Sequence, residues 1–492
     1  MNIRHTIQAT GLAAVMLVAG SCSKSFLDQK PYNSVPASNA IKNDADMNAA
    51  VNGLYATLRS VDLYGLTLFL KGDLMSDNCF LTTANSGRYL TFNQYNMINS
   101  DGNANNVWAN AYAAIKNANL IINSTIASND NVSQLKAEAL TVRALMHFEL
   151  VRNFGTPYAV DPTKPGIPIV LTFDQNALPA RNTIKEVYTQ VIADLTAAAG
   201  LVKYTINNSM TFNSTGSSRT LNTSFVTKYA ISGLLARVYQ NMGDWANAKT
   251  AALDVVNNGG FTLTASSGLT AYWALGTPRT DKVETIFEIT QDANGNNNGN
   301  GLTLPGLYLP AASPYKGTYG DVLANASLYN LYTSTDARKS LITVGTRAGQ
   351  VSSAYICRKY SGNTTDFDDT KVLRYADVLL ILAEAYYNTG DLVNANLTLN
   401  KVATQRDPSF VGYASVGTQV LEDILTERRK ELAFEGSRFW DLVRLQRSFV
   451  KVQDQDAPQN NITVAPSNQK LIFPIPLNET NVNKTIAQNP GY

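Results

Sequence analysis

Apolar residues recur along most of the chain with the period of an α-helix. From about Asp44 onward they return at three- and four-residue steps, as one face of a helix requires, over residues 50–58, 108–119 and 135–149. The same spacing predicts further helices over 183–199, 224–242, 244–257, 371–388, 391–404 and 418–434. Strand-like stretches are short and few: 166–171, 285–289 and 471–475. The pattern therefore predicts a mainly α protein with a few short β-strands.

Two distant segments share one pattern. Residues 235–248 align without gaps on residues 382–395, and both read L-A-x-x-Y-x-N-x-G-D-x-x-N-A. The glycine (Gly243 or Gly390) is suited to the left-handed position that ends a helix, and the aspartate after it can cap the next one. This resembles a tetratricopeptide (TPR) helix hairpin. Because the copies lie far apart, we expect TPR-like hairpins interrupted by long loop insertions, at 78–106, 153–182, 203–222, 259–282 and 291–326.

The first residues predict export and a lipid anchor. A short apolar run over residues 10–20 is well below the ~20 residues that cross a membrane as a helix, and is typical of a signal peptide. Small residues before Cys22 resemble a bacterial lipoprotein cleavage box, in which Cys22 is the lipid attachment site. The alternative is a plain secretory signal with Cys22 near the cut by chance. We divide the chain into a signal peptide (1–21), an extended tether (22–43) and one helical body (44–492), with parts 44–222 and 223–492.

The amino-acid composition excludes several classes of function. Lys and Arg number 40 against 38 Asp and Glu, which argues against nucleic-acid binding through a broad basic surface. Of two histidines, His5 lies in the predicted signal peptide, so the mature chain keeps only His147, expected as a hydrogen-bonded structural residue. Zinc centres and histidine-dependent hydrolases are therefore disfavoured. Cys79 and Cys357 could pair, but buried thiols are favoured. Abundant Asn and 24 Tyr suit neutral polar ligands.

Four collinear motifs resemble the SusD/RagB family of outer-membrane nutrient-binding lipoproteins from Bacteroidota. They lie at residues 373–385, 427–444 (E-R-R-K-E-L-A-F-E-G-S-R-F-W-D-L-V-R), 473–476 (F-P-I-P) and 488–492, with further matches at 26–28 and 136–154. The resemblance implies a TPR-like helical fold, lipid-anchored at the outer membrane and facing the cell exterior. It also implies a SusC-like TonB-dependent β-barrel partner, to which such proteins pass oligosaccharides or, in some branches, peptides. Family members bind their ligands and are not known as catalysts.

Aromatic rings in the insertions are the candidate ligand platform, since a sugar's apolar face stacks on a ring while its hydroxyl groups bond to polar side chains. We expect the first and the 302–320 insertions to converge, with Tyr308, Tyr315 and Tyr319 exposed. Tyr272 and Trp273 fit the core as well as they fit the platform. Trp108, Trp245 and Trp440 are expected in the core. The candidate ligand-binding residues are Arg88, Tyr89, Asn93, Tyr95, Tyr272, Trp273, Tyr308, Tyr315 and Tyr319.

The acids in the helical motifs are predicted to be structural. Asp377 and Glu384 are seven residues apart, about 10.5 Å along a helix, which matches neither spacing of glycosidase carboxylates. Their apolar neighbours imply burial, and buried acids require partners. We expect internal ion pairs between this helix and the helix 421–435, on which Arg428 and Glu435 share one face.

No metal or cofactor is predicted. Residues 292–303 depart from a calcium loop at Asn297 and Thr303, so this stretch is expected to be a flexible loop.

The functional prediction is a cell-surface glycan-binding lipoprotein that serves a SusC-like transporter, with no catalytic residues. The alternatives are a peptide-binding member of the same family, an all-α secreted glycoside hydrolase or lyase, and a scaffold for protein partners alone. Release of reducing ends from a polysaccharide would distinguish the hydrolase, and retention without release the binding protein.

Overall fold

The computed structural model describes residues 40–174, 176–291, 301–311, 317–360 and 368–492. The predicted signal peptide, Cys22 and most of the tether lie outside the described residues, as do Tyr315 and the Asn-rich loop 292–300.

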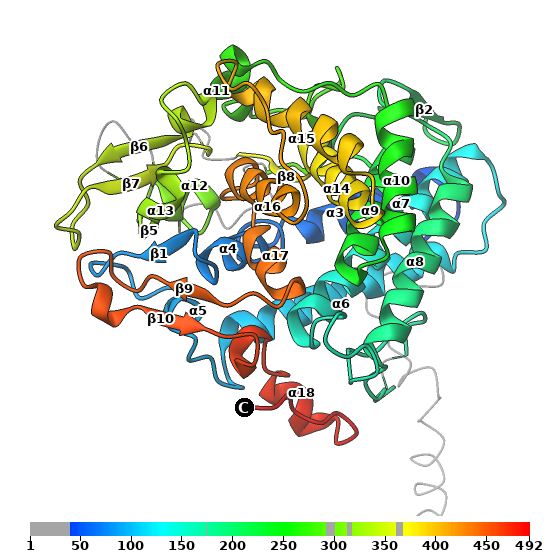
Figure 1. The fold of residues 1–492 in the computed structure, drawn as a ribbon. Coiled ribbons are helices and arrows are strands. Elements are labelled where there is room, and N and C mark those ends of the chain that lie inside the picture. Colours follow the sequence, from blue (N-terminus) through cyan, green and yellow to red (C-terminus); the bar gives the residue numbers. More distant parts are fainter. Residues whose placement is uncertain (1–39, 175, 292–300, 312–316, 361–367) are drawn as a thin grey trace, which may run out of the picture. The chain divides into compact units, whose positions relative to one another are not determined.

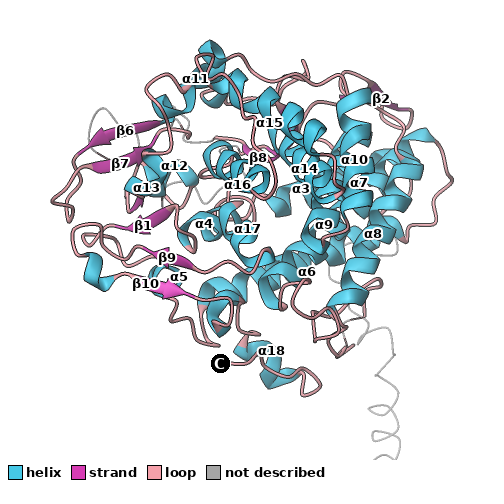
Figure 2. Ribbon diagram, viewed as in Figure 1, coloured by secondary structure: helices cyan, strands magenta, loops and turns pink. Residues whose placement is uncertain are grey.

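The described residues are mainly helical, as predicted (Figure 2). None of their helices is both long enough and apolar enough to cross a membrane. The helices are α3 (Asp44–Leu58), α4 (Thr67–Leu74), α5 (Leu90–Gln94), α6 (Gly102–Ile122), α7 (Asp130–Phe154), α8 (Ile184–Leu201), α9 (Lys228–Met242), α10 (Trp245–Asn258), α11 (Leu269–Trp273), α12 (Leu304–Tyr308), α13 (Ala326–Tyr329), α14 (Tyr375–Asn388), α15 (Leu392–Arg406), α16 (Gln419–Glu431), α17 (Arg438–Arg444) and α18 (Leu477–Val482).

The long helices pack in chain order. Helix α3 lies on α6 and α7, α7 contacts α8, α8 contacts α9, and the pair α9–α10 packs on α14, which contacts α15 and α16. In Figure 1 the paired helices α7 to α10, α14 and α15 gather on one side, and strands β1, β6 and β7 lie on the other. Residues Asn43–Tyr492 form one compact unit.

The two repeated segments form helix hairpins, as the sequence predicts. Gly243 (φ 76°) ends α9 and Gly390 (φ 83°) follows α14, each in the left-handed region. The side chain of Asp244 then accepts the N–H of Asn247 at the start of α10, and Asp391 caps α15 in the same way. Ala248 and Ala395 are fully buried where the paired helices meet. The same local chemistry therefore builds both TPR-like hairpins.

The strands are short and antiparallel. A four-stranded sheet has the order β1 (Cys79–Leu81), β5 (Val322–Ala324), β7 (Ala354–Cys357), β6 (Ile342–Gly345). Three two-stranded pairs join β2 (Ser209–Phe212) to β3 (Ser217–Thr220), β4 (Thr285–Ile289) to β8 (Thr370–Arg374), and β9 (Phe449–Lys451) to β10 (Ile462–Val464). One face of the four-stranded sheet packs through Phe80, Leu309, Leu323, Ala354 and Ile356.

The strand at 285–289 is confirmed, but those predicted at 166–171 and 471–475 are wrong. Ile169 donates its N–H to the side chain of Asn182, and Phe473 donates to the carbonyl of Asn153 at the end of α7. In the first segment, Gly166 also donates to the carbonyl of Asn182, and Asn182 donates to that of Ile167. This pairing stops at one isolated bridge, Pro165 with Thr183, so neither segment becomes a strand.

The turn after α16 closes tightly against α4. A Cβ placed on Gly72 would lie 1.9 Å from the carbonyl oxygen of Gly436, which itself has a φ of 72°. The carboxylate of Asp73 accepts the N–H groups of Phe434 and Gly436 in this turn. Only glycine at position 72 permits this approach, and the approach places Glu435 in the interior.

Candidate functional site

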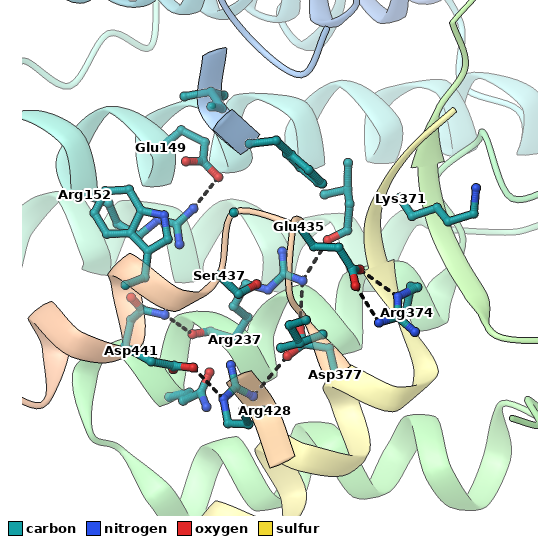
Figure 3. Close-up of a pocket in the computed structure, with 18 of the residues that line it drawn as sticks. Glu149, Arg152, Arg237, Lys371, Arg374, Asp377, Arg428, Glu435, Ser437 and Asp441 are labelled. Atoms are coloured by element: carbon teal, nitrogen blue, oxygen red, sulfur yellow. Dashed lines mark hydrogen bonds and ion pairs between the residues drawn. The ribbon is translucent and has the colours of Figure 1, made fainter. Parts of the chain in front are cut away.

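A buried cluster of ion pairs lies between α9, α14, α16 and α17, and we call it the charged cluster (Figure 3). Its first half is centred on Arg374, whose guanidinium lies 2.8 Å from Glu284, 2.9 Å from Glu431 and 2.7 Å from Glu435. Arg406 bridges two of the same acids, at 2.9 Å from Glu284 and 3.0 Å from Glu431. Each of these two cations thus contacts more than one carboxylate, so the buried charges compensate one another.

The second half contains the acids of α14. Asp377 lies between Arg237, at 2.8 Å, and Arg428, at 3.1 Å, and Arg428 continues to Asp441 at 2.9 Å. The ion pair between Asp377 and Arg428 is the one expected between these two helices.

Glu384 and Glu435, also expected to pair between these two helices, pair with residues of other elements. Glu384 pairs with Arg444 on α17 at 2.7 Å and accepts a hydrogen bond from Gln240. Glu435 pairs with Arg374 and with Lys359, at 2.5 Å. The reason is that α16 ends at Glu431, earlier than predicted, and the following turn carries Glu435 off the helix face that holds Arg428.

Nearby arginines keep two carboxylates of the charged cluster, Asp441 and Glu431, in the ionised form. Burial alone would raise the pKa of Asp441, but the nearby Arg428 and Arg444 guanidinium groups lower it to about 2. Burial likewise opposes ionisation of Glu431, yet Arg406, Arg374 and Arg338 hold its pKa well below the ordinary value. Such carboxylates are poor proton donors near neutral pH, which disfavours the general-acid role that glycoside hydrolysis requires.

The cavity inside the charged cluster is small. It measures about 50 Å³, enough for a few water molecules at most and too little for a sugar ring. Trp440 lies at its edge with the Arg152 guanidinium 4.5 Å from its ring, and Arg152 pairs with Glu149. The cluster therefore serves as a framework that positions the surrounding elements.

Most of the predicted platform aromatics are buried, so the expected exposure of Tyr308 is wrong, and Tyr272 and Trp273 belong to the core. Tyr308 is fully buried and stacks on Tyr360 with ring centres 5.9 Å apart, and Trp273 lies under Lys359. Tyr272 bonds to Thr285 inside the same core. This burial is hard to predict because the Gly and Pro residues around these rings are typical of loops, whereas α11 and α12 are short helices buried in the interior.

The first insertion is also more buried than expected. Tyr89 is 7% exposed and its hydroxyl lies 3.1 Å from that of Thr67. Tyr95 is 6% exposed and donates to the carbonyl of Met75. The side chain of Asn93 is used internally as well, between the N–H of Leu81 and the side chain of Gln453. These three residues fix the insertion onto the body.

Arg88 and Tyr319 behave differently, because they meet at the surface. The Arg88 guanidinium lies 4.2 Å from the centre of the Tyr319 ring, and both side chains are half-buried. Arg347 donates to the carbonyls of Tyr319 and Gly320 from a third loop, at 2.7 and 2.8 Å. We call residues 83–88, 317–321 and 346–350 the loop surface. The expected approach of the two insertions is thus found, at the surface in this pair and below it where Phe80 packs with Leu309 and β1 pairs with β5. Sequence reasoning missed the third loop.

The remaining aromatic and polar predictions have mixed outcomes. Trp108 is in the core, at 5% exposed, but Trp245 and Trp440 are only half-buried, because both begin helices at the rim of the body. Cys79 and Cys357 are free and buried.

His147 is structural, as expected. It is fully buried, with Nδ1 3.1 Å from the carbonyl of Arg143 and Nε2 accepting the N–H of Val170. Burial lowers its pKa to about 3, so it stays neutral.

The fold defines a class of protein. Its body consists of TPR-like helix hairpins with a small sheet, its interior holds the charged cluster, and insertions form part of its outer surface. Comparison with known proteins leads to the same class. Residues 25–240 match the family model described as "Starch-binding associating with outer membrane", and residues 351–492 match the model described as "SusD family".

Relatives of known name span the whole chain. "SusD-like protein P2" of Formosa agariphila is 26% identical over 97% of this chain and 98% of its own. A crystal structure of a putative sugar binding protein from Bacteroides vulgatus has a TM-score of 0.79 and 26% identity, covering 92% of this chain and all of that one. A SusD superfamily structure from Bacteroides thetaiotaomicron matches with the same TM-score and identity. The chain belongs to the SusD/RagB family.

Proposed function

We propose that this protein is a lipid-anchored, cell-surface glycan-binding protein that captures oligosaccharides and delivers them to a SusC-like TonB-dependent transporter. Membership of a family known for carbohydrate binding supports the ligand class. The short apolar leader and Cys22 support the anchor. The partnership with a β-barrel rests on family resemblance.

The observation that carries the proposal is the Arg88–Tyr319 pair on the loop surface. A half-buried tyrosine ring offers an apolar face for the C–H side of a sugar, and the guanidinium offers planar donors to its hydroxyl groups. Hydrogen bonds join the loops that carry this pair. The hydroxyl of Thr83 donates to the carbonyl of Gly349 at 2.6 Å, and the N–H of Ser86 donates to Asp321 at 3.1 Å. A pre-ordered platform loses little entropy when a ligand binds.

The test is titration of the purified protein with a panel of oligosaccharides, using Tyr319→Ala and Tyr387→Ala. Tyr387 is also half-buried but lies at the end of α14, so it is the matched control. We expect Tyr319→Ala to weaken binding at least ~10-fold, or about 1.4 kcal/mol, with Tyr387→Ala unchanged. Equal affinities in both variants would reject the loop surface as the glycan site.

Two further measurements address the alternatives. Release of the protein from membranes by Cys22→Ala would support the anchor, and copurification of a β-barrel would support the transporter. Retention of peptides but of no saccharide would replace the glycan ligand with a peptide.

A further inference from the structure

A second region has the size of a ligand site. An open cleft of about 420 Å³ lies between the start of α13, α17 and strand β9, and its walls include Asp77, Asn325, Arg438, Ser448 and Val450. Ligand sites commonly occupy roughly 300–1,000 Å³. We call this region the open cleft. It involves neither Arg88 nor Tyr319.

Cations outnumber carboxylates behind the open cleft. Arg438 forms a two-pronged contact with Asp77, at 2.8 and 2.9 Å, and Arg429 approaches the same carboxylate at 3.5 Å. A third basic group, Lys451, is fully buried, bonds through Nζ to the carbonyl of Cys79, and is close enough to Asp77 for their charges to interact when it is protonated. At the rim, Arg447 and Glu422 form an exposed pair that adds no net charge.

The charged residues behind the open cleft shift one another's pKa values. Burial would raise the pKa of Asp77, but the Arg438 hydrogen bonds and the charges of Arg438 and Arg429 bring it below its ordinary value. Burial lowers the pKa of Lys451 to about 7, with Asp77 and Cys79 acting in the opposite direction. Asp77 therefore stays negative near neutral pH, and one carboxylate facing two guanidinium groups leaves an excess of positive charge.

The cleft walls also offer hydrogen-bond donors without a partner and an apolar surface. Arg438 donates to Asp77 through Nε and Nη2, and among the described residues its Nη1 forms no hydrogen bond. Ser448 is exposed and its hydroxyl likewise has no partner there. Val450 is 53% exposed on the same wall. This combination fits a compact polar ligand that has an apolar face and carries a negative group.

We infer that the open cleft binds an anionic substituent, a carboxylate or a sulfate ester, on a saccharide. The saccharide part rests on the proposed function, whereas the preference for an anion follows from the cations of the cleft. The free Nη1 of Arg438 would contact the anion, with the Arg447–Glu422 pair at the rim, and the side of the sugar ring would lie on Val450. An acidic glycan would then engage the protein at two places, the loop surface and the open cleft.

The test measures binding of trigalacturonic acid, galactose 6-sulfate and neutral galactotriose by titration calorimetry. Ser448→Trp fills the cleft from an exposed position, and Arg447→Gln removes a rim charge. Val393→Trp is the matched control, since Val393 is 71% exposed on α15. The melting temperature of each variant checks that it is folded.

We expect an anionic probe to bind the wild type at least ~10-fold more tightly than galactotriose. Ser448→Trp should weaken that binding at least ~10-fold and Arg447→Gln about threefold with a smaller salt dependence, while Val393→Trp has no effect. Comparing the two anionic probes shows whether carboxylate or sulfate is preferred.

Three outcomes would overturn the inference: no binding of either anionic probe, equal affinity for galactotriose, or unchanged affinity in Ser448→Trp. If Tyr319→Ala abolishes saccharide binding and Ser448→Trp does not, the loop surface stands and the open cleft fails. If the reverse holds, the proposed loop site fails and the cleft stands.

Discussion

The charged cluster and the open cleft draw on the same stretch of chain, residues 427–447, but they handle charge in opposite ways. In the cluster, Arg374 and Arg428 each meet carboxylates at 2.7–3.1 Å, and the remaining space is about 50 Å³. In the cleft, the single carboxylate of Asp77 serves two arginines beside a space of about 420 Å³.

The difference shows how one motif can serve both structure and recognition. A buried charge costs several kcal/mol unless it is paired, so the cluster is stable only because it is complete. At a solvent-accessible surface an unmatched cation remains hydrated, so it can exchange water for a ligand's anion. A buried group of charges that is fully paired indicates a structural framework. A surplus of cations beside an open cleft indicates a binding site.

The largest expected effect comes from opening the cluster. Gly72→Ala would place a methyl group 1.9 Å from the Gly436 carbonyl and force α4 away from the turn that carries Glu435. We expect a loss of about 4 kcal/mol or more in the free energy of unfolding. Gly53→Ala is the control, because no atom lies within 4 Å of its Cβ and a helical alanine should stabilise by roughly 0.5–1 kcal/mol. Urea denaturation of both variants would show whether the close approach matters.

Removing a central cation should cost slightly less. Arg374→Met leaves Glu284, Glu431 and Glu435 short of a partner, and we expect a loss of about 3–5 kcal/mol. Arg447→Met breaks only the exposed pair with Glu422 and should change stability by less than about 1 kcal/mol. If the two variants unfold at the same urea concentration, the contrast between cluster and surface is wrong.

A smaller effect is expected at Glu384. Glu384→Gln keeps the shape but weakens the contact with Arg444, which retains Asp441 at 2.8 Å, so we expect a loss of about 1–3 kcal/mol. Saccharide affinity should not change, because Glu384 is fully buried. Loss of binding at an unchanged melting temperature would instead assign this acid a direct role in recognition.

The subtlest test uses pH. Burial lowers the pKa of Lys451 from 10.5 to about 7, so between these values the unfolded chain binds a proton that the folded chain has released. Stability contributed by this residue should therefore rise as pH increases from 7 toward 10, by a few kcal/mol at most. The rise should be smaller in Lys451→Met, as read from urea midpoints at pH 7 and 9.5. An identical pH profile in both proteins would show that Lys451 keeps its ordinary pKa.

Much of the fold is predictable from sequence because its causes are local. The Gly-Asp pairs at 243–244 and 390–391 end one helix and cap the next using atoms within a few residues. The site is less predictable, as Tyr308 and Tyr319 show: both lie near glycines in one insertion, yet one is fully buried and the other is at the surface. Their burial depends on which distant segments cover them, and no short pattern records that.

The sequence by itself determined the helical hairpins, the family and the expectation that Asp377 and Glu384 are buried and paired. Only the tertiary structure decided that Glu384 pairs with Arg444, that Arg88 meets Tyr319, and that Asp77 and Arg438 line one cleft. The physical reason is range. Helix periodicity and capping act over three or four residues, whereas these contacts join positions 60 to 361 residues apart, which only the packing of the whole body brings together.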